Sequence, residues 1–452
     1  MRTPLLFIIP FFIGIITASA QQSTVLDEYI RIGLSENLSL KQQQLDIQKS
    51  MEAIRQAKAM FYPTVQLNAN YTVAAGGRKI DFPIGDLLNP VYSTLNQLTQ
   101  SNNFSLVENQ QVQFLPNNFQ ETKVKFSYPI YNTDLKYNRQ IKELLLLSKT
   151  AQKAAYEQEL RHNISHAYLQ YIQAVEAEKV WKSALVVLQE LRRFNESLVK
   201  NNVATRDIVA DADYQISKTD HEIFDLKSKQ NTARAYFNFL INRDLQSEVV
   251  VDSSILLLTI PVYDREQLVK NALTNRNEMA ALSAGREAAT TAIQLQEANL
   301  KIPDFYIGGE TGFQGYGYRF NSNQAFVLAQ VGLTYDLYKG GAQKSKVQEA
   351  RIDAEKINTQ MNEVRMQIVL QVTERWNQLS SAQNAHETSQ QGQKAAEESF
   401  RIINNKYKAG QVLLIEFLTA QNRVTTARLQ TLLAWLDVLQ SQQALLQVAG
   451  GQ

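Results

Sequence analysis

Cysteine is absent from this chain of 452 residues. Its absence excludes disulfide bonds, thiolate metal sites and a lipid-modified cysteine after a leader segment. Charge of one sign is also scarce, because 46 basic and 44 acidic residues leave a formal net charge of +2. The composition therefore indicates no strongly charged partner such as a nucleic acid.

Proline, a strong breaker of regular structure, is missing from long parts of the chain. None occurs between Pro129 and Pro261, and none follows Pro303. These parts are rich in Ala, Leu, Glu, Gln, Lys and Arg, which favour helices. We therefore expect two unusually long helices, over about residues 134–200 and 343–407, each followed by a turn and a shorter helix.

Long hydrophobic runs are also rare, and the main one lies at the N-terminus. Arg2 precedes an apolar run from Leu5 to Ile16, and Ala18-Ser19-Ala20 then gives the small-x-small pattern of a secretory cleavage site. The run is shorter than the roughly 20 apolar residues that a membrane-spanning helix needs. We expect residues 1–20 to be a cleaved signal peptide and any later membrane insertion to use strands.

Residues 64–74 alternate between apolar and polar side chains, which predicts a strand with one apolar face and one polar, solvated face. The same alternation predicts strands over about residues 121–131, 304–316 and 325–338. No Lys, Arg, Asp or Glu occupies the apolar positions, where a Lys or Arg at mid-bilayer would cost about 2 to 4 kcal/mol. Strands of this length with tyrosines near their ends are typical of outer-membrane barrels. The alternative is a water-soluble sheet packed on a helix.

Four strands cannot close a barrel, and open strand edges are not tolerated in lipid. We therefore expect several copies of the chain to share one wall. Two copies would supply eight strands, whose side chains would largely fill the interior, whereas three would supply twelve and a wider bore. A conduit favours the trimer.

The order helix, strand, strand, long helix, helix occurs twice. FSYPIYNTD from Phe126 matches LTYDLYKGG from Leu333, and MFYPTVQL matches KIPDFYIG. The first copy is longer because of residues 75–120, a polar stretch that we expect to be a long external loop. The expected division is a first repeat at 21–245 with a helical hairpin at 134–245, a linker at 246–263, and a second repeat at 264–452 with a hairpin at 342–448.

Both hairpin turns carry motifs of a known family. KYKAGQVLLIEFLTAQNRV from Lys406 matches a Tyr-x-x-Gly-x-x-x-x-x-acid-x-Leu-x-x pattern, and NNVATRDIVADA from Asn201 matches the corresponding first turn. TYDLYKGGAQKSKVQEA from Thr334 adds to the likeness at a strand-to-helix junction. Over essentially the whole chain after the leader, the sequence resembles the TolC-like family of outer membrane channels.

The resemblance implies a mostly helical homotrimer with a twelve-stranded β-barrel in the outer membrane and a long helical tunnel in the periplasm. It implies a passive exit duct of an efflux or type I secretion system, not an enzyme and without a cofactor. The implied partners are a periplasmic adaptor protein, an inner-membrane pump and outer membrane lipid, with no nucleic acid. A soluble periplasmic coiled-coil scaffold or adhesin is the competing interpretation.

The resemblance also implies a gate at the periplasmic end of the tunnel. Asp207 and Tyr407 match a contact pair between the hairpins, and Glu416 matches an acid of a ring that faces the lumen. Three copies of one carboxylate in a narrow lumen would repel one another, bind cations and raise one another's proton affinity. Val412 and Thr419 depart from the family pattern, which often has an arginine and a second acid there. The implied adaptor-docking helix tips are Asn201, Asn202, Ala409 and Gly410.

Two possible metal sites have plainer explanations. His162 and His166 lie one helical turn apart, but a third ligand and the glutamate of an HExxH motif are missing. Asp207, Asp211 and Asp213 lack the glycine and the terminal glutamate of an EF-hand loop. We expect a plain helix surface for the histidines and a helix tip for the aspartates.

Overall fold

The structure is a computed structural model that describes residues 25–450. The expected signal peptide, residues 1–20, lies outside the described residues. The chain divides into two compact units, and both predicted repeats contribute to each unit. The repeat boundaries therefore remain a prediction from the sequence. Unit 1 comprises the described residues of Met1–Ile47, Ser148–Ser283 and Gln360–Gln452, and unit 2 comprises Gln48–Leu147 and Ala284–Thr359.

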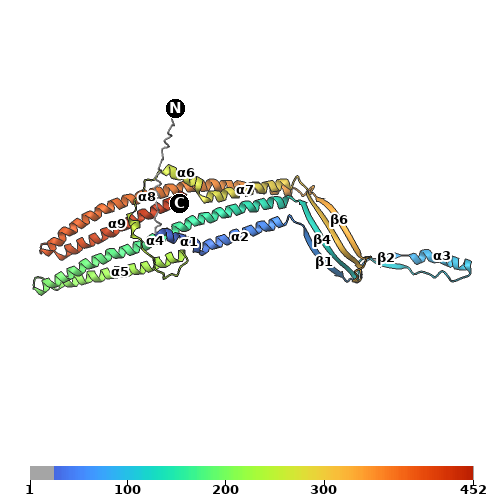
Figure 1. The fold of residues 1–452 in the computed structure, drawn as a ribbon, viewed down its shortest axis with the longest axis horizontal. Helices are drawn as coiled ribbons and strands as arrows, with labels where there is room; N and C mark the ends of the chain where they lie inside the picture. The colour runs from blue at the N-terminus through green and yellow to red at the C-terminus, as the bar shows by residue number, and fades with distance from the viewer. Residues whose placement is uncertain (1–24, 451–452) are drawn as a thin grey trace, which may run out of the picture. The chain divides into compact units, whose positions relative to one another are not determined.

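Unit 2 contains a four-stranded sheet with the order β1-β4-β5-β6, in which all neighbours are antiparallel (Figure 1). Its strands are β1 (Thr64–Thr72), β4 (Phe119–Tyr131), β5 (Asp304–Tyr316) and β6 (Ala325–Thr334). All four predicted strands are confirmed within a few residues. β1 and β6 are edges, so each leaves one row of backbone groups without a partner in the sheet.

The register gives the sheet one apolar face. Leu67 lies opposite Val124, Val124 opposite Thr311, and Thr311 opposite Val327. Leu67 is 72% exposed and Val327 is 83% exposed. A contiguous exposed apolar surface of this kind marks contact with a membrane or another protein.

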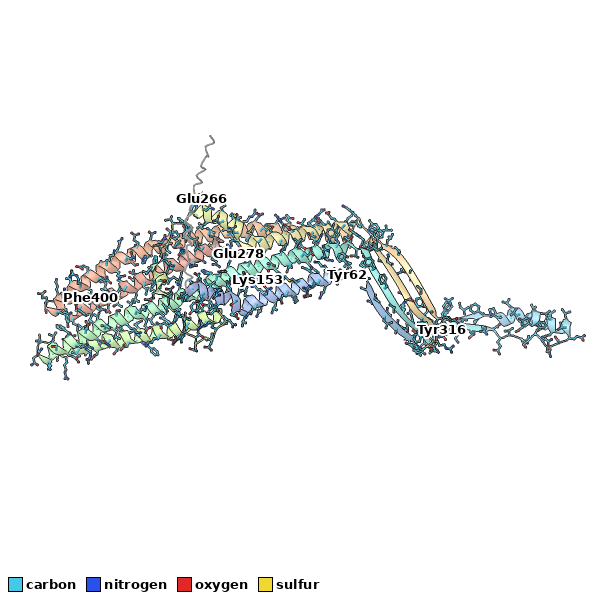
Figure 2. All side chains as sticks on the ribbon, viewed as in Figure 1. Tyr62, Lys153, Glu266, Glu278, Tyr316 and Phe400 are labelled. Atoms are coloured by element: carbon cyan, nitrogen blue, oxygen red, sulfur yellow. The ribbon has the colours of Figure 1, made fainter. Side chains whose placement is uncertain are left out.

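The opposite face of the sheet carries charge. The ammonium group of Lys123 lies 2.8 Å from Glu121 and 2.9 Å from Glu310. Aromatic side chains lie at both ends of the sheet, with Tyr62 just before β1 and Tyr316 at the end of β5 (Figure 2). The sheet therefore has the apolar band, the polar reverse side and the flanking aromatic residues of a membrane strand set.

The segment between β1 and β4 is not the loop that we expected. It forms a second, two-stranded sheet of β2 (Lys79–Phe82) and β3 (Gln110–Gln113), with helix α3 (Ile84–Thr99) between them. The expectation was wrong because prolines and asparagines usually interrupt helices, but the apolar residues of this segment recur at helical spacing and form α3. Pro90 lies inside the helix, and Pro83 directly precedes it.

Two helical hairpins follow the two strand pairs, as predicted. Their helices are α4 (Thr133–Lys200), α5 (Asp207–Leu240), α8 (Ala342–Lys408) and α9 (Leu414–Val448). The two hairpins have nearly equal arms, of 68 and 34 residues in the first and 67 and 35 in the second. Hydrogen bonds cross each hairpin, from Gln230 to the carbonyl of Ala174 and from Thr431 to the carbonyl of Ser389. The equal lengths agree with an internal repeat.

Shorter helices complete the described chain. They are α1 (Val25–Glu36), α2 (Leu38–Ala59), the 3-10 helix η1 (Ser253–Leu257), α6 (Arg265–Asn275) and α7 (Asn277–Ala298). Among the described residues, no helix is both long enough and apolar enough to cross a lipid bilayer.

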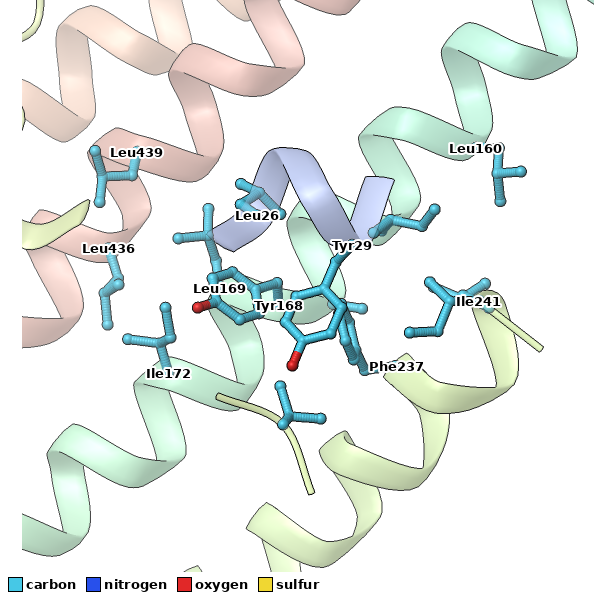
Figure 3. Close-up of a cluster of buried hydrophobic side chains, with 14 of the residues drawn as sticks. Leu26, Tyr29, Leu160, Tyr168, Leu169, Ile172, Phe237, Ile241, Leu436 and Leu439 are labelled. Atoms are coloured by element: carbon cyan, nitrogen blue, oxygen red, sulfur yellow. The ribbon is translucent and has the colours of Figure 1, made fainter. Parts of the chain in front are cut away.

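The main core of unit 1 joins α1, α4 and α5 to the segment after α5 (Figure 3). Tyr29 and Phe237 meet edge to face, with ring centroids 5.0 Å apart. The buried hydroxyl of Tyr168 donates to the carbonyl of Val250 and accepts from the amide of Asp252, both at 2.9 Å. Burial raises the pKa of Tyr168 to about 12. The predicted linker is thus fixed to the core of this unit.

Candidate functional site at the hairpin turns

The two hairpin turns have the same backbone design. The residues Asn202 and Gly410 adopt left-handed conformations, with φ of 55° and 70°. Each turn is closed by an amide that reaches back to the end of the long helix, from Val203 to the carbonyl of Leu198 and from Gln411 to that of Lys406, both at 2.9 Å. Asparagine tolerates this conformation better than other side chains do, so the first turn keeps the geometry without glycine. The expected docking residues Asn201, Asn202, Ala409 and Gly410 are all exposed.

A buried hydrogen bond ties the two hairpins together close to these turns. The hydroxyl of Tyr407 donates to Asn195 Oδ1 at 2.8 Å. The amide nitrogen of Asn195 in turn donates to the carbonyl of Ile208 at 2.8 Å. Tyr407 is buried and Asn195 is fully buried. One asparagine therefore connects α8, α4 and α5.

Aromatic rings surround this hydrogen bond. The ring of Tyr407 lies 5.2 Å from that of Phe417 and 5.9 Å from that of Phe194, measured between centroids. Phe400, on α8 in Figure 2, lies 5.4 Å from Phe417. Burial raises the pKa of the Tyr407 phenol, and the contact with Asn195 offsets part of that rise. The buried members of this cluster are Leu188, Leu191, Ala212, Tyr407, Phe417 and Leu418.

The two predicted gate acids lie in the first turns of the shorter helices. Glu416 is exposed, and its Oε1 accepts from the backbone amide of Leu413 at 3.3 Å. Asp207 is exposed and accepts from the hydroxyl of Thr205. Negative charge at a helix N-terminus is favoured by the helix dipole. Glu416 thus caps the start of α9, whereas Asp207 is bonded to the Thr205 side chain and the start of α5 has no side-chain cap. The role of both carboxylates in a gate remains a prediction.

The structure brings Tyr407 to Asn195, whereas the resemblance paired Tyr407 with Asp207. In the described chain, the hydroxyl of Tyr407 and the carboxylate of Asp207 each have another partner. A contact between Tyr407 and Asp207 of different copies is not tested by a single chain. The pairing therefore stays a prediction about the assembly.

Asn195 is the residue that the sequence analysis missed, although a signal for it exists. Leu188, Leu191, Asn195 and Leu198 follow one another at spacings of three and four residues on α4. In such an apolar seam, a single asparagine fixes the register between helices. A second missed contact is the ion pair between Arg192 Nε and Asp213 Oδ1 at 2.5 Å, which also joins α4 to α5.

The structure gives no support for metal ligation by the two histidines. The rings of His162 and His166 lie 6.1 Å apart and are half-buried. Burial lowers the pKa of both imidazoles, and nearby positive charge adds to the effect at His162. Within residues 25–450, no group of three potential His, Asp or Glu ligands comes together.

Known structures share this combination of a two-faced sheet and paired helical hairpins. The outer-membrane channel OprN superimposes with a TM-score of 0.73 at 15% identity, covering 95% of this chain and 90% of that one. The outer membrane protein VceC from Vibrio cholerae gives 0.73 at 16% identity, covering 94% and 96%. The open state of the MtrE outer membrane channel from Neisseria gonorrhoeae gives 0.73 at 16% identity, covering 94% and 89%.

These likenesses define the class of fold: the chain folds like the protomers of solved outer-membrane channels. Residues 268–451 match the model of the outer membrane efflux protein family. The resemblance to TolC-like outer membrane efflux proteins is thereby confirmed. No curated protein matches the sequence.

Proposed function

We propose that three copies of this chain form an outer membrane channel that serves as a passive exit duct. The sheet is the observation that carries the proposal. It has one exposed apolar face, one charged face and two open edges, β1 and β6. Lipid contact accounts for the first, a water-filled lumen for the second, and pairing between copies for the third.

The number of copies follows from the size of the wall. Each copy supplies four strands to the sheet. Twelve strands from three copies leave an open bore, whereas eight from two copies are largely filled by side chains. The duct does no chemistry, and the energy for transport comes from its partners. The channel would dock by the hairpin turns on a periplasmic adaptor that an inner-membrane pump carries, in an efflux or type I secretion system.

The gate in this proposal lies at the hairpin turns. Glu416 is exposed there, so three copies around one axis would place three carboxylates close to the lumen. Opposing carboxylates repel and bind cations. The aromatic cluster around Tyr407 holds the two hairpins of each copy together. Opening of the gate therefore requires both turns to move outward as one rigid unit, without unfolding.

The alternative of a soluble periplasmic scaffold is less well supported. A scaffold would keep the apolar face of the sheet covered, yet Val327 and Val331 are 83% and 75% exposed. Fractionation of cells separates the two proposals. The channel is expected in the outer membrane fraction and requires detergent for release, whereas the scaffold would leave with the periplasmic fluid.

The gate is tested separately in a planar bilayer. Glu416→Ala should raise single-channel conductance or weaken its block by divalent cations, because three negative charges leave the constriction. Glu355→Ala, a change at an exposed acid near the start of α8 and far from the turn, serves as the control. Unchanged conductance and block in Glu416→Ala would remove this residue from the gate and leave the channel itself standing.

A further inference from the structure

Helix α3 belongs to the segment between β1 and β4. Two of its asparagines bind one face of the helix to the returning part of that segment. Asn89 exchanges two hydrogen bonds with the backbone of Val107, at 3.0 and 2.8 Å. Asn96 does the same with Phe104, at 2.8 and 3.0 Å. The two asparagines lie about two helical turns apart, so the returning segment runs along this face of the helix.

Two further contacts close the same face. Gly85 is buried, and a side chain there would place its Cβ only 2.4 Å from the carbonyl of Val107. The rings of Tyr92 and Phe104 lie 6.0 Å apart. The inner face of α3 is therefore complete within one chain, and its orientation is fixed.

The opposite face of α3 is apolar and uncovered. Leu87, Val91 and Leu98 are 70%, 53% and 76% exposed. Their spacings of four and seven residues place them on one stripe, on the far side from Asn89 and Asn96. We define these three residues as the α3 stripe. In a single chain the apolar side of a helix normally faces the core, whereas the α3 stripe is exposed.

The composition of the residues around the α3 stripe indicates that the stripe contacts protein rather than lipid. No charged residue occurs between Asp86 and Glu108. Helices that lie on a membrane surface are typically rich in Lys and Arg on the polar face, and α3 has none. The polar positions of α3 are Asn, Ser, Thr and Gln apart from one aspartate, which suits packing against an uncharged surface.

The point of attachment indicates which protein lies nearby. The segment that carries α3 leaves β1 after Thr72 and enters β4 at Phe119. β1 has its free edge toward the next copy in a shared wall, where it meets the free edge of β6. At the base of the segment, the amide of Ala74 donates to Asn117 and so joins its outgoing and returning parts. The amide of Gly317, directly after β5, donates to the carbonyl of Asn118 and holds the base to the sheet. Each copy of α3 therefore rises at a junction between copies.

We propose that the α3 stripes of the three copies pack against one another around the threefold axis and form an assembled collar at the end of the barrel away from the helices. This inference rests on the proposed trimeric channel. Side chains at positions Leu87, Val91 and Leu98 would then be buried between copies, and the uncharged composition of the segment avoids like-charge repulsion around the threefold axis.

Cysteine cross-linking tests the collar, because the native chain has no cysteine to interfere. Val91→Cys and Leu98→Cys are made one at a time in the full chain, and Ser93→Cys provides an exposed control on the same helix but off the stripe. Purified protein is oxidised, or treated with a short bis-maleimide, and then denatured. The collar predicts covalent dimers from both stripe variants and none from Ser93→Cys, within particles that contain three chains before denaturation.

The outcomes separate the collar from the channel. Three-chain particles in which the stripe cysteines do not cross-link, or cross-link no better than Ser93→Cys, overturn the collar and leave the channel intact. Covalent dimers found only in six-chain particles also overturn it, because the stripe would then join two trimers end to end. A protein that remains a single chain in detergent overturns the proposed channel and the collar with it.

Discussion

The hydroxyl of Tyr407 lies 2.8 Å from Asn195 Oδ1, although the two residues are separated by 212 positions in the sequence. The bond joins the last turn of α8 to α4, and the other end of the asparagine amide holds the start of α5. Three helix ends thus depend on one side chain. If the hairpin turns form the gate, this contact keeps each pair of hairpins moving together.

The first prediction concerns the loss of the Asn195 side chain and its two hydrogen bonds. Asn195→Ala leaves the buried hydroxyl of Tyr407 without its partner, which costs about 1 to 3 kcal/mol. It also removes the bond to the carbonyl of Ile208 that holds the start of α5 to α4. We expect a lower unfolding midpoint and a noisier channel current. Tyr214→Phe, which removes a hydroxyl from an exposed tyrosine of α5, should change neither. Equal stability of Asn195→Ala and the native protein would show that the contact is dispensable.

The second prediction concerns the apolar face of the sheet. Leu67→Lys places an ammonium group where lipid is expected, at a cost of about 2 to 4 kcal/mol near mid-bilayer. The fraction of protein that reaches the folded, detergent-extracted state should fall. Asn70→Lys is the matched control, because Asn70 lies on the other face, opposite Glu121. Comparable losses in both variants would argue against lipid on the apolar face.

The third prediction concerns ion selectivity. Lys123 forms ion pairs with Glu121 and Glu310 on the charged face, and Lys123→Gln removes both pairs. In a trimer the lumen loses three positive charges, so the reversal potential in a salt gradient should shift toward cation selectivity. Lys79→Gln, in β2 outside the four-stranded sheet, serves as the control. An unchanged reversal potential would place Lys123 away from the path of the ions.

The fourth prediction concerns pH. Burial lowers the pKa of His162 and His166 below 6.5. As the pH falls below 6.5, the unfolded chain takes up protons before the folded chain does, so this part of the stability is present above that pH and is lost below it. The unfolding midpoint should decline between about pH 7 and about pH 5. The double variant His162→Gln, His166→Gln should decline less over the same interval, and an identical decline would assign the effect to other groups.

The elements that could be predicted from the sequence are those whose environment imposes a regular spacing of apolar and polar residues. Contact with lipid on one side only requires alternation, and the alternation of Val65 and Leu67 with polar residues is therefore enough to predict β1. The absence of breakers likewise indicated α4 and α8 to within a few residues. Helix α3 was missed because Pro90 and its many asparagines resemble a loop, while the contacts that stabilise it come from the returning segment.

The candidate site was predictable only in part. The turn motifs located Gly410 and Glu416, because backbone geometry and capping are local to the sequence. The partner of Tyr407 was not predictable in this way, since no local rule connects position 407 with Asn195. The asparagine in the apolar seam of α4 signals a polar contact but not the identity of its partner.

The central claim is that one chain supplies only part of the channel wall, and the mass of the intact particle tests it most directly. Native mass spectrometry of the protein extracted from the outer membrane in detergent should show particles of three chains, each of 51.3 kDa for the full sequence less the mass of the predicted signal peptide. Particles of a single folded chain, stable in buffer without detergent, would contradict the account.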